Sequence, residues 1–373
     1  MEYKSFLPPK RVLMGPGPSN IHPRVLEAQS RLTIGHLDPK FVELMDEIKA
    51  LLQYAFQTDN EVTFPVSAPG STGMETCLVN LIEPGEQVAV CVNGVFGGRM
   101  KSIIERCGGI PIVIEDEWGT AVTTSKVEQT LAQNPEVKIL AFVHAETSTG
   151  ARSDAKIISE IGKKYNCLIV ADTVTSLGGS ELKVDEWNLD AVYSGTQKCL
   201  SCPPGLSPVT FSKAAIDKIK NRKTPVQSWF MDVNLVLGYW GGGAKRSYHH
   251  TAPINSLYGL HEALILIKEE GIENSWNRHR LNGDLFCKAA ETIGLNPYVK
   301  EEERLSQLIA ISIPEGVDDA EVRSKLLSDY SLEIGAGLGS LAGKVWRIGL
   351  MGYSSNKSNI EFCISALRNV MSR

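Results

Sequence analysis

Short β-rich apolar runs alternate with helix-like segments between residues 87 and 211, and this alternation most narrows the folds that the chain can adopt. The apolar runs cover residues 87–92, 110–114, 138–143, 167–171, 190–194 and 208–211. Helical patterns intervene at residues 97–107, 124–133 and 155–165. Buried strands that alternate with helices of about 10 to 15 residues predict crossover connections and a mostly parallel sheet covered on both faces. We therefore expect an α/β fold.

The pattern changes after residue 230. Residues 230–251 are aromatic and rich in glycine, and we expect a loop there. A long helical run at 254–293 is interrupted near Gly271. Strand and helix patterns then follow in the order 308–313, 318–329, 344–348 and 357–371. This order predicts an α+β layer, so we divide the chain into an N-terminal segment (1–20), a large domain (21–270) and a small C-terminal domain (271–373).

Charge and composition exclude several classes of function. The net charge of -5 leaves no basic surplus for a nucleic acid or an acidic membrane surface. The apolar runs are far shorter than the roughly 20 residues of a membrane span, and we read no secretory signal at the N-terminus. Eight scattered cysteines are typical of free thiols in a reducing compartment, so we expect a cytoplasmic protein. Cys199 and Cys202 have a C-x-x-C spacing, but a second ligand pair is lacking and no metal site is expected.

Ligands of open parallel sheets lie beyond the carboxyl ends of the strands, so the segments that follow the predicted strands are the places to look for chemistry. Lys198 stands four residues after the run that ends at residue 194, among small residues such as Gly195 and Thr196. Small residues let a ligand approach the backbone, and a lysine in an apolar pocket loses basicity, so that its neutral amine can form a Schiff base with a carbonyl group. Taken alone, such a lysine is more often a solvated surface residue.

Asp172 directly follows the buried run 167–171 and stands 26 residues before Lys198. A carboxylate at the end of a buried strand is unfavourable unless it is paired with a cation or well hydrogen-bonded. A protonated pyridine nitrogen is such a cation, whereas the simpler interpretation is a helix N-cap. The position of Asp172 relative to Lys198 favours the functional interpretation.

The segment 67–75 brings Gly70, Ser71 and Thr72 to the start of a helical run. Backbone N–H groups and the positive end of a helix dipole suit a phosphate there, although a plain helix start would look the same. Phe96 could stack on a planar ring, although most phenylalanines belong to the core.

Together these residues resemble the class V aminotransferases of the pyridoxal-phosphate (PLP) fold type I. The resemblance runs from Gly15-Pro16-Gly17-Pro18-Ser19 to the C-terminal segment 343–349, which covers essentially the whole chain. It implies a transaminase that moves the amino group of alanine or serine to glyoxylate or pyruvate. The alanine-glyoxylate and serine-pyruvate type fits the sequence best.

The resemblance also implies residue roles. Lys198 forms the Schiff base with PLP, and Asp172 pairs with the ring nitrogen. The other cofactor-binding residues are Gly70, Ser71, Thr72, Phe96, Thr147, Thr175 and Gln197, with Tyr248 and Thr251 contributed by the partner subunit of a homodimer. Gly17 and Arg347 bind the substrate, and Arg347 clamps its carboxylate.

Alternatives remain open at this stage. The main rival is a ureidoglycine-glyoxylate aminotransferase, which the segments 117–120 and 344–353 resemble. Cysteine desulfurases carry His before the lysine, where Gln197 stands here, and phosphoserine aminotransferases need additional basic residues. A dinucleotide-binding oxidoreductase should have its glycine fingerprint after a strand, yet prolines flank Gly17 and no strand precedes Gly15. A non-catalytic PLP-binding protein would not need Lys198, Asp172 and Arg347 together.

Overall fold

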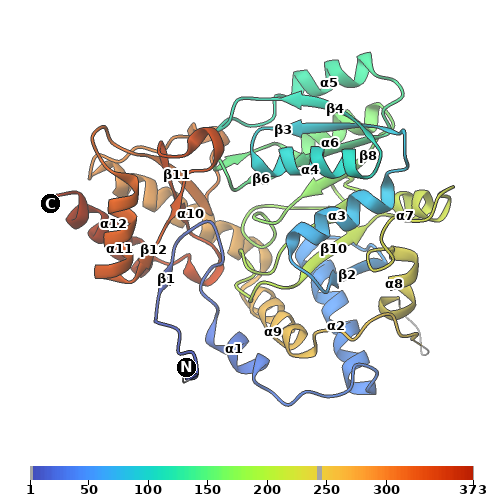
Figure 1. Ribbon diagram of the computed structural model, residues 1–373, viewed down its shortest axis with the longest axis horizontal. Helices are drawn as coiled ribbons and strands as arrows, with labels where there is room; N and C mark the ends of the chain where they lie inside the picture. Colours follow the sequence, from blue (N-terminus) through green and yellow to red (C-terminus); the bar gives the residue numbers. More distant parts are fainter. Residues whose placement is uncertain (1–2, 242–245, 373) are drawn as a thin grey trace.

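The computed structural model describes residues 3–241 and 246–372, and these form two lobes. Figure 1 shows the larger lobe on the right, around one sheet and its helices, and the C-terminal elements on the left. The blue N-terminal segment runs along both lobes. Strand β1 (Val12–Leu13) pairs in parallel with β12 (Leu332–Glu333), so the start of the chain is tied to its C-terminal part.

The large lobe contains a seven-stranded sheet with the strand order β2-β10-β9-β8-β5-β3-β4. Its strands are β2 (Val62–Val66), β3 (Gln87–Val92), β4 (Ile110–Glu115), β5 (Ile139–Val143), β8 (Leu168–Asp172), β9 (Ala191–Tyr193) and β10 (Ser207–Phe211). Strand β10 is antiparallel to both of its neighbours, and all other pairings are parallel. The expected α/β fold with a mostly parallel sheet is confirmed. Strand β2 was not expected; it contains Pro65, which an edge strand tolerates.

The helices of this lobe are α1 (Pro23–Gln29), α2 (Pro39–Phe56), α3 (Gly70–Leu81), α4 (Val95–Arg106), α5 (Thr124–Gln133), α6 (Ala155–Lys164), α7 (Lys213–Lys220), α8 (Val233–Trp240) and α9 (Ile254–Glu270). The three predicted crossover helices are confirmed as α4, α5 and α6. Side chains set several helix starts: the carboxylate of Asp154 accepts the N–H of Ile157 at the start of α6.

The expected loop at 230–251 is wrong over part of its length, because α8 lies inside it. The carboxylate of Asp232 caps this helix by accepting the N–H of Asn234. Val233, Val236 and Tyr239 are buried on one face, which is the three-to-four-residue spacing of an amphipathic helix. The glycine content obscured this periodicity. Part of the glycine run, residues 242–245, lies outside the described residues.

The C-terminal lobe follows the expected order of elements. Its main elements are α10 (Ile272–Glu291), β11 (Leu308–Ser312), α11 (Asp319–Tyr330), β13 (Gly335–Ala336), β14 (Val345–Gly349) and α12 (Lys357–Met371). Strands β11, β14 and β13 form an antiparallel sheet. Gly271 separates α9 from α10 with a φ of 86°, a conformation that favours glycine.

Two large clusters of buried side chains form the core. One fills the large lobe between the sheet and its helices. The other lies among α10, α11, α12 and the antiparallel sheet, and it includes Met14 from the N-terminal segment. The division into residues 1–20, 21–270 and 271–373 stays a prediction. Within the described residues, no helix is both long and apolar enough to cross a membrane.

The sheet places three of the polar segments side by side. Strands β5, β8 and β9 are adjacent and parallel, and Val143 pairs with Asp172, which in turn pairs with Tyr193. The segments that follow these three strands therefore leave the same edge of the sheet. Those segments contain Thr147, Asp172 and Lys198.

Candidate active site

Lys198 follows β9 and is only 9% exposed. Burial lowers the pKa of its amine to about 8, and the charge of Arg347 lowers it further, while Cys199 and Asp172 oppose the shift. The amine donates a hydrogen bond to the carbonyl of Pro16. A lysine in this environment is partly neutral near physiological pH, which is the form that attacks a carbonyl carbon or accepts a proton.

The backbone around Lys198 is held by the N-terminal segment. The N–H of Ser19 donates to the carbonyl of Gln197 at 2.9 Å, and the Ser19 hydroxyl donates to the carbonyl of Lys198 at 2.8 Å. Ser201 has a φ of 50°, in the left-handed region, and its hydroxyl accepts the N–H of Tyr353 at 2.7 Å. Residues far apart in the sequence thus orient the lysine, and Ser19 was not predicted to do so.

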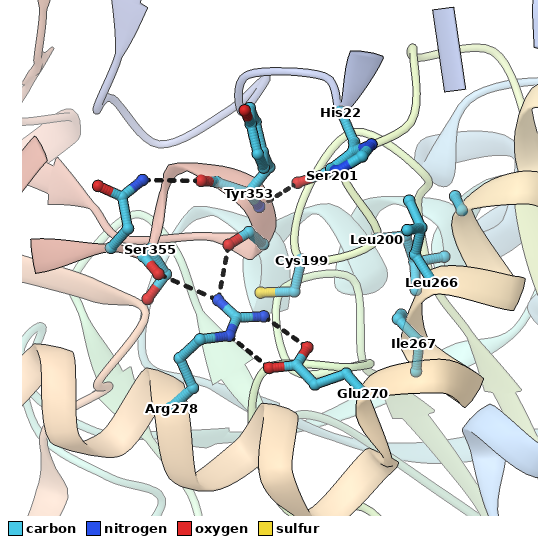
Figure 2. Close-up of a pocket in the computed structure, with 13 residues that line it drawn as sticks. His22, Cys199, Leu200, Ser201, Leu266, Ile267, Glu270, Arg278, Tyr353 and Ser355 are labelled. Carbon is cyan, nitrogen blue, oxygen red and sulfur yellow. Dashed lines mark hydrogen bonds and ion pairs between the residues drawn. The ribbon is translucent and has the colours of Figure 1, made fainter. Parts of the chain in front are cut away.

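A cavity of about 350 Å³ lies behind the lysine segment, lined by Cys199, Leu200 and Ser201 (Figure 2). Figure 2 shows the guanidinium of Arg278 between the carboxylate of Glu270 and the turn that contains Ser355. Arg278 thereby ties the C-terminal turn to the junction of α9 and α10. Lys198, Asp172 and Arg347 do not line this cavity, so it is separate from the buried group around Lys198.

Asp172 ends β8 and is 3% exposed. Its two carboxylate oxygens accept hydrogen bonds from the N–H of Val174 and the hydroxyl of Tyr193, both at 2.8 Å. Burial raises its pKa to about 7, and the nearby Glu146 adds to the shift. Turns, not a helix, follow at residues 174–179, so the N-cap interpretation does not apply. A buried carboxylate of this kind is stabilised by a cation such as a protonated ring nitrogen.

Gly70, Ser71 and Thr72 form the first turn of α3, after Pro69 at the N-cap. Pro69 offers no side-chain cap, and the N–H of Thr72 donates to the Pro69 carbonyl at 2.8 Å, so the N–H groups of Gly70 and Ser71 are those that the turn can offer to an anion. A Cβ atom on Gly70 would lie 3.3 Å from Val174, which stands two residues after Asp172 in the sequence. The start of α3 therefore packs closely on the segment that follows β8.

Gln197 and Arg99 add polar groups to this region. The side-chain oxygen of Gln197 is buried without a hydrogen-bond partner among the described residues, as expected of a group that binds a ligand. Arg99 was missed in the sequence. Its guanidinium donates to the Ser71 hydroxyl at 2.8 Å and lies 4.9 Å from the centre of the Phe96 ring, so it connects two of the predicted cofactor residues.

Arg347 lies in β14 and is 6% exposed. Its Nε donates to the carbonyl of Ala336 at 2.7 Å, and its Nη1 donates to the carbonyl of Thr147 at 3.1 Å. Burial lowers its pKa to about 10, and Glu146 opposes the shift. Among the described residues no carboxylate forms an ion pair with it, so the guanidinium keeps donors for a ligand carboxylate.

Thr147, Thr175 and Gly17 also lie in this region. The hydroxyls of Thr147 and Thr175 are buried and 3.1 Å apart. Gly17 has a φ of 108°, and a Cβ atom there would lie 2.5 Å from the Lys198 amine. Only glycine allows this approach.

The structure leaves Tyr248 and Thr251 on the surface. Tyr248 is 63% exposed, and its ring lies 5.4 Å from that of His36. Thr251 is also exposed. Neither residue joins the buried group around Lys198 in its own chain.

Glu146 is a buried carboxylate of this region that was not predicted from the sequence. It lies in the hairpin of β6 (Ala145–Glu146) and β7 (Ala151–Arg152), and it is fully buried. Burial raises its pKa, and hydrogen bonds from Ser148, Gly97 and Phe96 oppose the shift. The sequence feature that could have identified it is a carboxylate three residues after the entirely apolar strand β5.

Comparisons with known proteins agree with this geometry. The family model "Aminotransferase class-V" matches residues 12–360. An alanine–glyoxylate aminotransferase of Rattus norvegicus is 41% identical over 97% of this chain and 88% of its own length. An (S)-ureidoglycine–glyoxylate transaminase of Bacillus subtilis is 35% identical over 98% of this chain and 91% of its own. The crystal structure of an alanine–glyoxylate aminotransferase from Nostoc sp. is 45% identical, with a TM-score of 0.97 over 100% of this chain and 98% of that one.

Proposed function

The chain belongs to the class V aminotransferases, a family of PLP-dependent transaminases, and we propose that it moves the amino group of alanine or serine to glyoxylate or pyruvate. The observation that carries the proposal is one buried site that combines a lysine of lowered pKa with an arginine that has no carboxylate partner among the described residues. The lysine suits a carbonyl cofactor, and the arginine suits the carboxylate that amino acids and 2-oxo acids share.

The residues fit PLP. Asp172 is a buried carboxylate of raised pKa that would pair with the ring nitrogen. The first turn of α3 would bind the phosphate, with the side-chain NH2 group of Gln197 donating to it, and Phe96 would stack on the ring. Thr147 and Thr175 would line the remaining edge of the cofactor. When bound, PLP draws electrons away from the α-carbon of the amino acid.

The chain's own groups then have distinct tasks. Lys198 would hold the cofactor through its amine and, once released, move the proton at the α-carbon of the donor as a general base. Arg347 would orient donor and acceptor by a bidentate contact with the carboxylate, and Gly17 leaves the space that the Lys198 side chain occupies. Because Arg347 binds the carboxylate that all these substrates share, the site would accept donors and acceptors with different small side chains.

A symmetric homodimer belongs to the same proposal. The exposure of Tyr248 and Thr251 supports a role in the phosphate site of a partner subunit. Trp229 and Leu235 on the same stretch are 62% and 42% exposed, as expected of a surface that a second copy covers. The eight cysteines are all free and buried, which supports a reducing, cytoplasmic location.

A donor panel tests the proposal. Alanine is supplied with glyoxylate, and serine and (S)-ureidoglycine are each supplied with glyoxylate and with pyruvate; the new amino acid is measured. We expect alanine or serine to give the highest kcat/KM. A clear preference for ureidoglycine would instead assign the chain the activity named for the Bacillus subtilis relative. Absence of transfer from every donor would contradict the proposal.

A further inference from the structure

Glu146 is a fully buried carboxylate with no role in the reaction outlined above. Burying a carboxylate is unfavourable unless hydrogen bonds or a cation compensate. Among the described residues, no Lys, Arg or His forms an ion pair with it. The unfavourable burial of this carboxylate must therefore be compensated by hydrogen bonds. The donors of these bonds show which parts of the chain Glu146 holds in place.

The donors belong to the first turn of α4 and to Ser148. One carboxylate oxygen accepts the N–H groups of Phe96 at 3.1 Å and Gly97 at 3.4 Å. The other accepts the N–H of Ser148 at 3.1 Å and its hydroxyl at 2.6 Å. The N-cap of α4 is Gly94, which has no side chain to cap the helix. Glu146 therefore supplies the cap from a distant part of the chain, at the end of the helix dipole that favours an anion.

Close packing restricts the carboxylate to this position. A Cβ atom on Gly94 would overlap Cγ and Cδ of Glu146 and would lie 2.6 Å from the Ser148 hydroxyl oxygen. That hydroxyl also accepts the N–H of Val95 at 3.0 Å. The side chains of Glu146 and Ser148, which flank Thr147, therefore both hydrogen-bond to the backbone at the start of α4.

The same segment touches the groups proposed to hold cofactor and substrate. Phe96, whose N–H Glu146 binds, is the proposed ring-stacking residue. The carbonyl of Thr147 accepts Nη1 of Arg347, and the Thr147 hydroxyl lies 3.1 Å from that of Thr175. The negative charge of Glu146 also opposes the loss of basicity that burial imposes on Arg347.

We propose that Glu146 is a positioning residue for the transamination: it fixes Phe96 against the cofactor ring and keeps Arg347 oriented for the substrate carboxylate. This inference rests on the proposed function, in which Phe96 and Arg347 have those tasks. Glu146 would act through these groups and not on the substrate itself, because both of its carboxylate oxygens already accept two hydrogen bonds each from the protein.

The variant Glu146→Gln tests this, because it keeps the shape of the side chain and removes its charge and one acceptor. We expect KM for donor and acceptor to rise roughly tenfold, with a smaller change in kcat. The affinity of the cofactor-free protein for PLP, measured by fluorescence titration, should fall by a similar factor. The absorption maximum of the bound cofactor should shift because its stacking partner is less well held.

Asp116→Asn is the matched control. Asp116 is 6% exposed; it accepts the N–H and hydroxyl of Thr123 at the start of α5, at 2.9 and 2.7 Å, and forms an ion pair with Lys126 at 2.7 Å. Both variants should lose thermal stability. Only Glu146→Gln should change KM, PLP affinity and the absorption spectrum. If the two variants change these quantities equally, Glu146 has a structural role alone and the inference is overturned.

A second comparison places Glu146→Gln in an Arg347→Ala background. If Glu146 acts through Arg347, its effect on KM should shrink there, whereas its effect on PLP affinity should persist through Phe96. Undiminished effects on KM would contradict the coupling. If Glu146→Gln does not fold, Ser148→Ala removes one of the four hydrogen bonds to Glu146 together with the acceptor of the Val95 N–H, and it should show the same changes more weakly. A wild-type protein that transfers no amino group contradicts the proposed function, whereas an active wild type with an unaffected Gln variant contradicts this inference alone.

Discussion

Arg347 and Lys198 share one buried site, and the positive charge of Arg347 adds to burial in lowering the pKa of the Lys198 amine to about 8. The two cations come from different lobes, since Lys198 follows β9 and Arg347 lies in β14. Neither has a carboxylate in ion-pair contact among the described residues. The site thus places an amine of lowered pKa, which can attack an electron-poor carbonyl carbon, near a guanidinium that can bind a carboxylate, and the expected outcomes below follow from this arrangement.

Replacement of Lys198 by Ala should leave a protein that binds PLP without a covalent link and performs no multiple turnovers. The wild-type protein should be yellow, and a carbonyl reagent should abolish its absorption band. Absorbance spectra and steady-state assays check both points. Full transaminase activity in the variant would assign the lysine role elsewhere.

Replacement of Arg347 by Ala removes charge-assisted hydrogen bonds to the substrate carboxylate. The expected loss is about 3 kcal/mol, or roughly a hundredfold in apparent affinity. It should appear mainly in KM, for donor and acceptor alike. Arg323→Ala serves as the control, because Arg323 pairs with Asp319 on α11. An unchanged KM in the Arg347 variant would place the carboxylate at another residue.

Asp172 should make the stability of the cofactor-free protein depend on pH. Burial raises its pKa from 3.8 to about 7, so between these values the folded state keeps a proton that the unfolded state releases. The free energy of unfolding should therefore fall as the pH rises from about 4 to 7, by up to about 4 kcal/mol relative to Asp172→Asn. Urea unfolding of both proteins across this range measures the difference. Parallel pH profiles would show that Asp172 is ionised throughout.

Gly17→Ala should abolish activity, because its Cβ atom would lie 2.5 Å from Nζ and 2.8 Å from Cδ of Lys198. Gly85→Ala is the matched control: Gly85 also has a positive φ, of 86°, but a Cβ atom there meets no atom within 4 Å. Both variants should lose about 1 kcal/mol of stability from backbone strain. Only Gly17→Ala should lose turnover, and equal activities would remove Gly17 from the site.

Mixed dimers test the shared site. Lys198→Ala chains refolded with chains altered at both Tyr248 and Thr251 should regain part of the activity. In such a heterodimer, one site has an intact lysine and receives Tyr248 and Thr251 of the partner subunit, whereas the other site collects both defects. Activity is measured after the heterodimers have been separated by a tag on one chain. Inactive heterodimers, or an active monomer, would place these two residues in the site of their own subunit.

The sequence by itself determined the α/β class, the order of the strands along the chain and most helices, because the periodicity of apolar residues is a local signal. It also pointed to Lys198 and Asp172, because polar residues after buried strands are unfavourable without a purpose. Helix α8 was not predicted because the glycines next to Trp240 are typical of a loop. Strand β2 was not predicted because it contains Pro65, which is acceptable only in an edge strand.

Only the tertiary structure decided which distant groups meet. Glu146 caps α4 from 50 residues away, Ser19 holds the backbone of Lys198 from 179 residues away, and Arg99 bridges Ser71 and Phe96. These contacts depend on strand order and on the way in which the N-terminal segment returns to the lysine. Neither is encoded in local periodicity, since hydrogen bonds between distant segments form only once the packed sheet brings their donors and acceptors together.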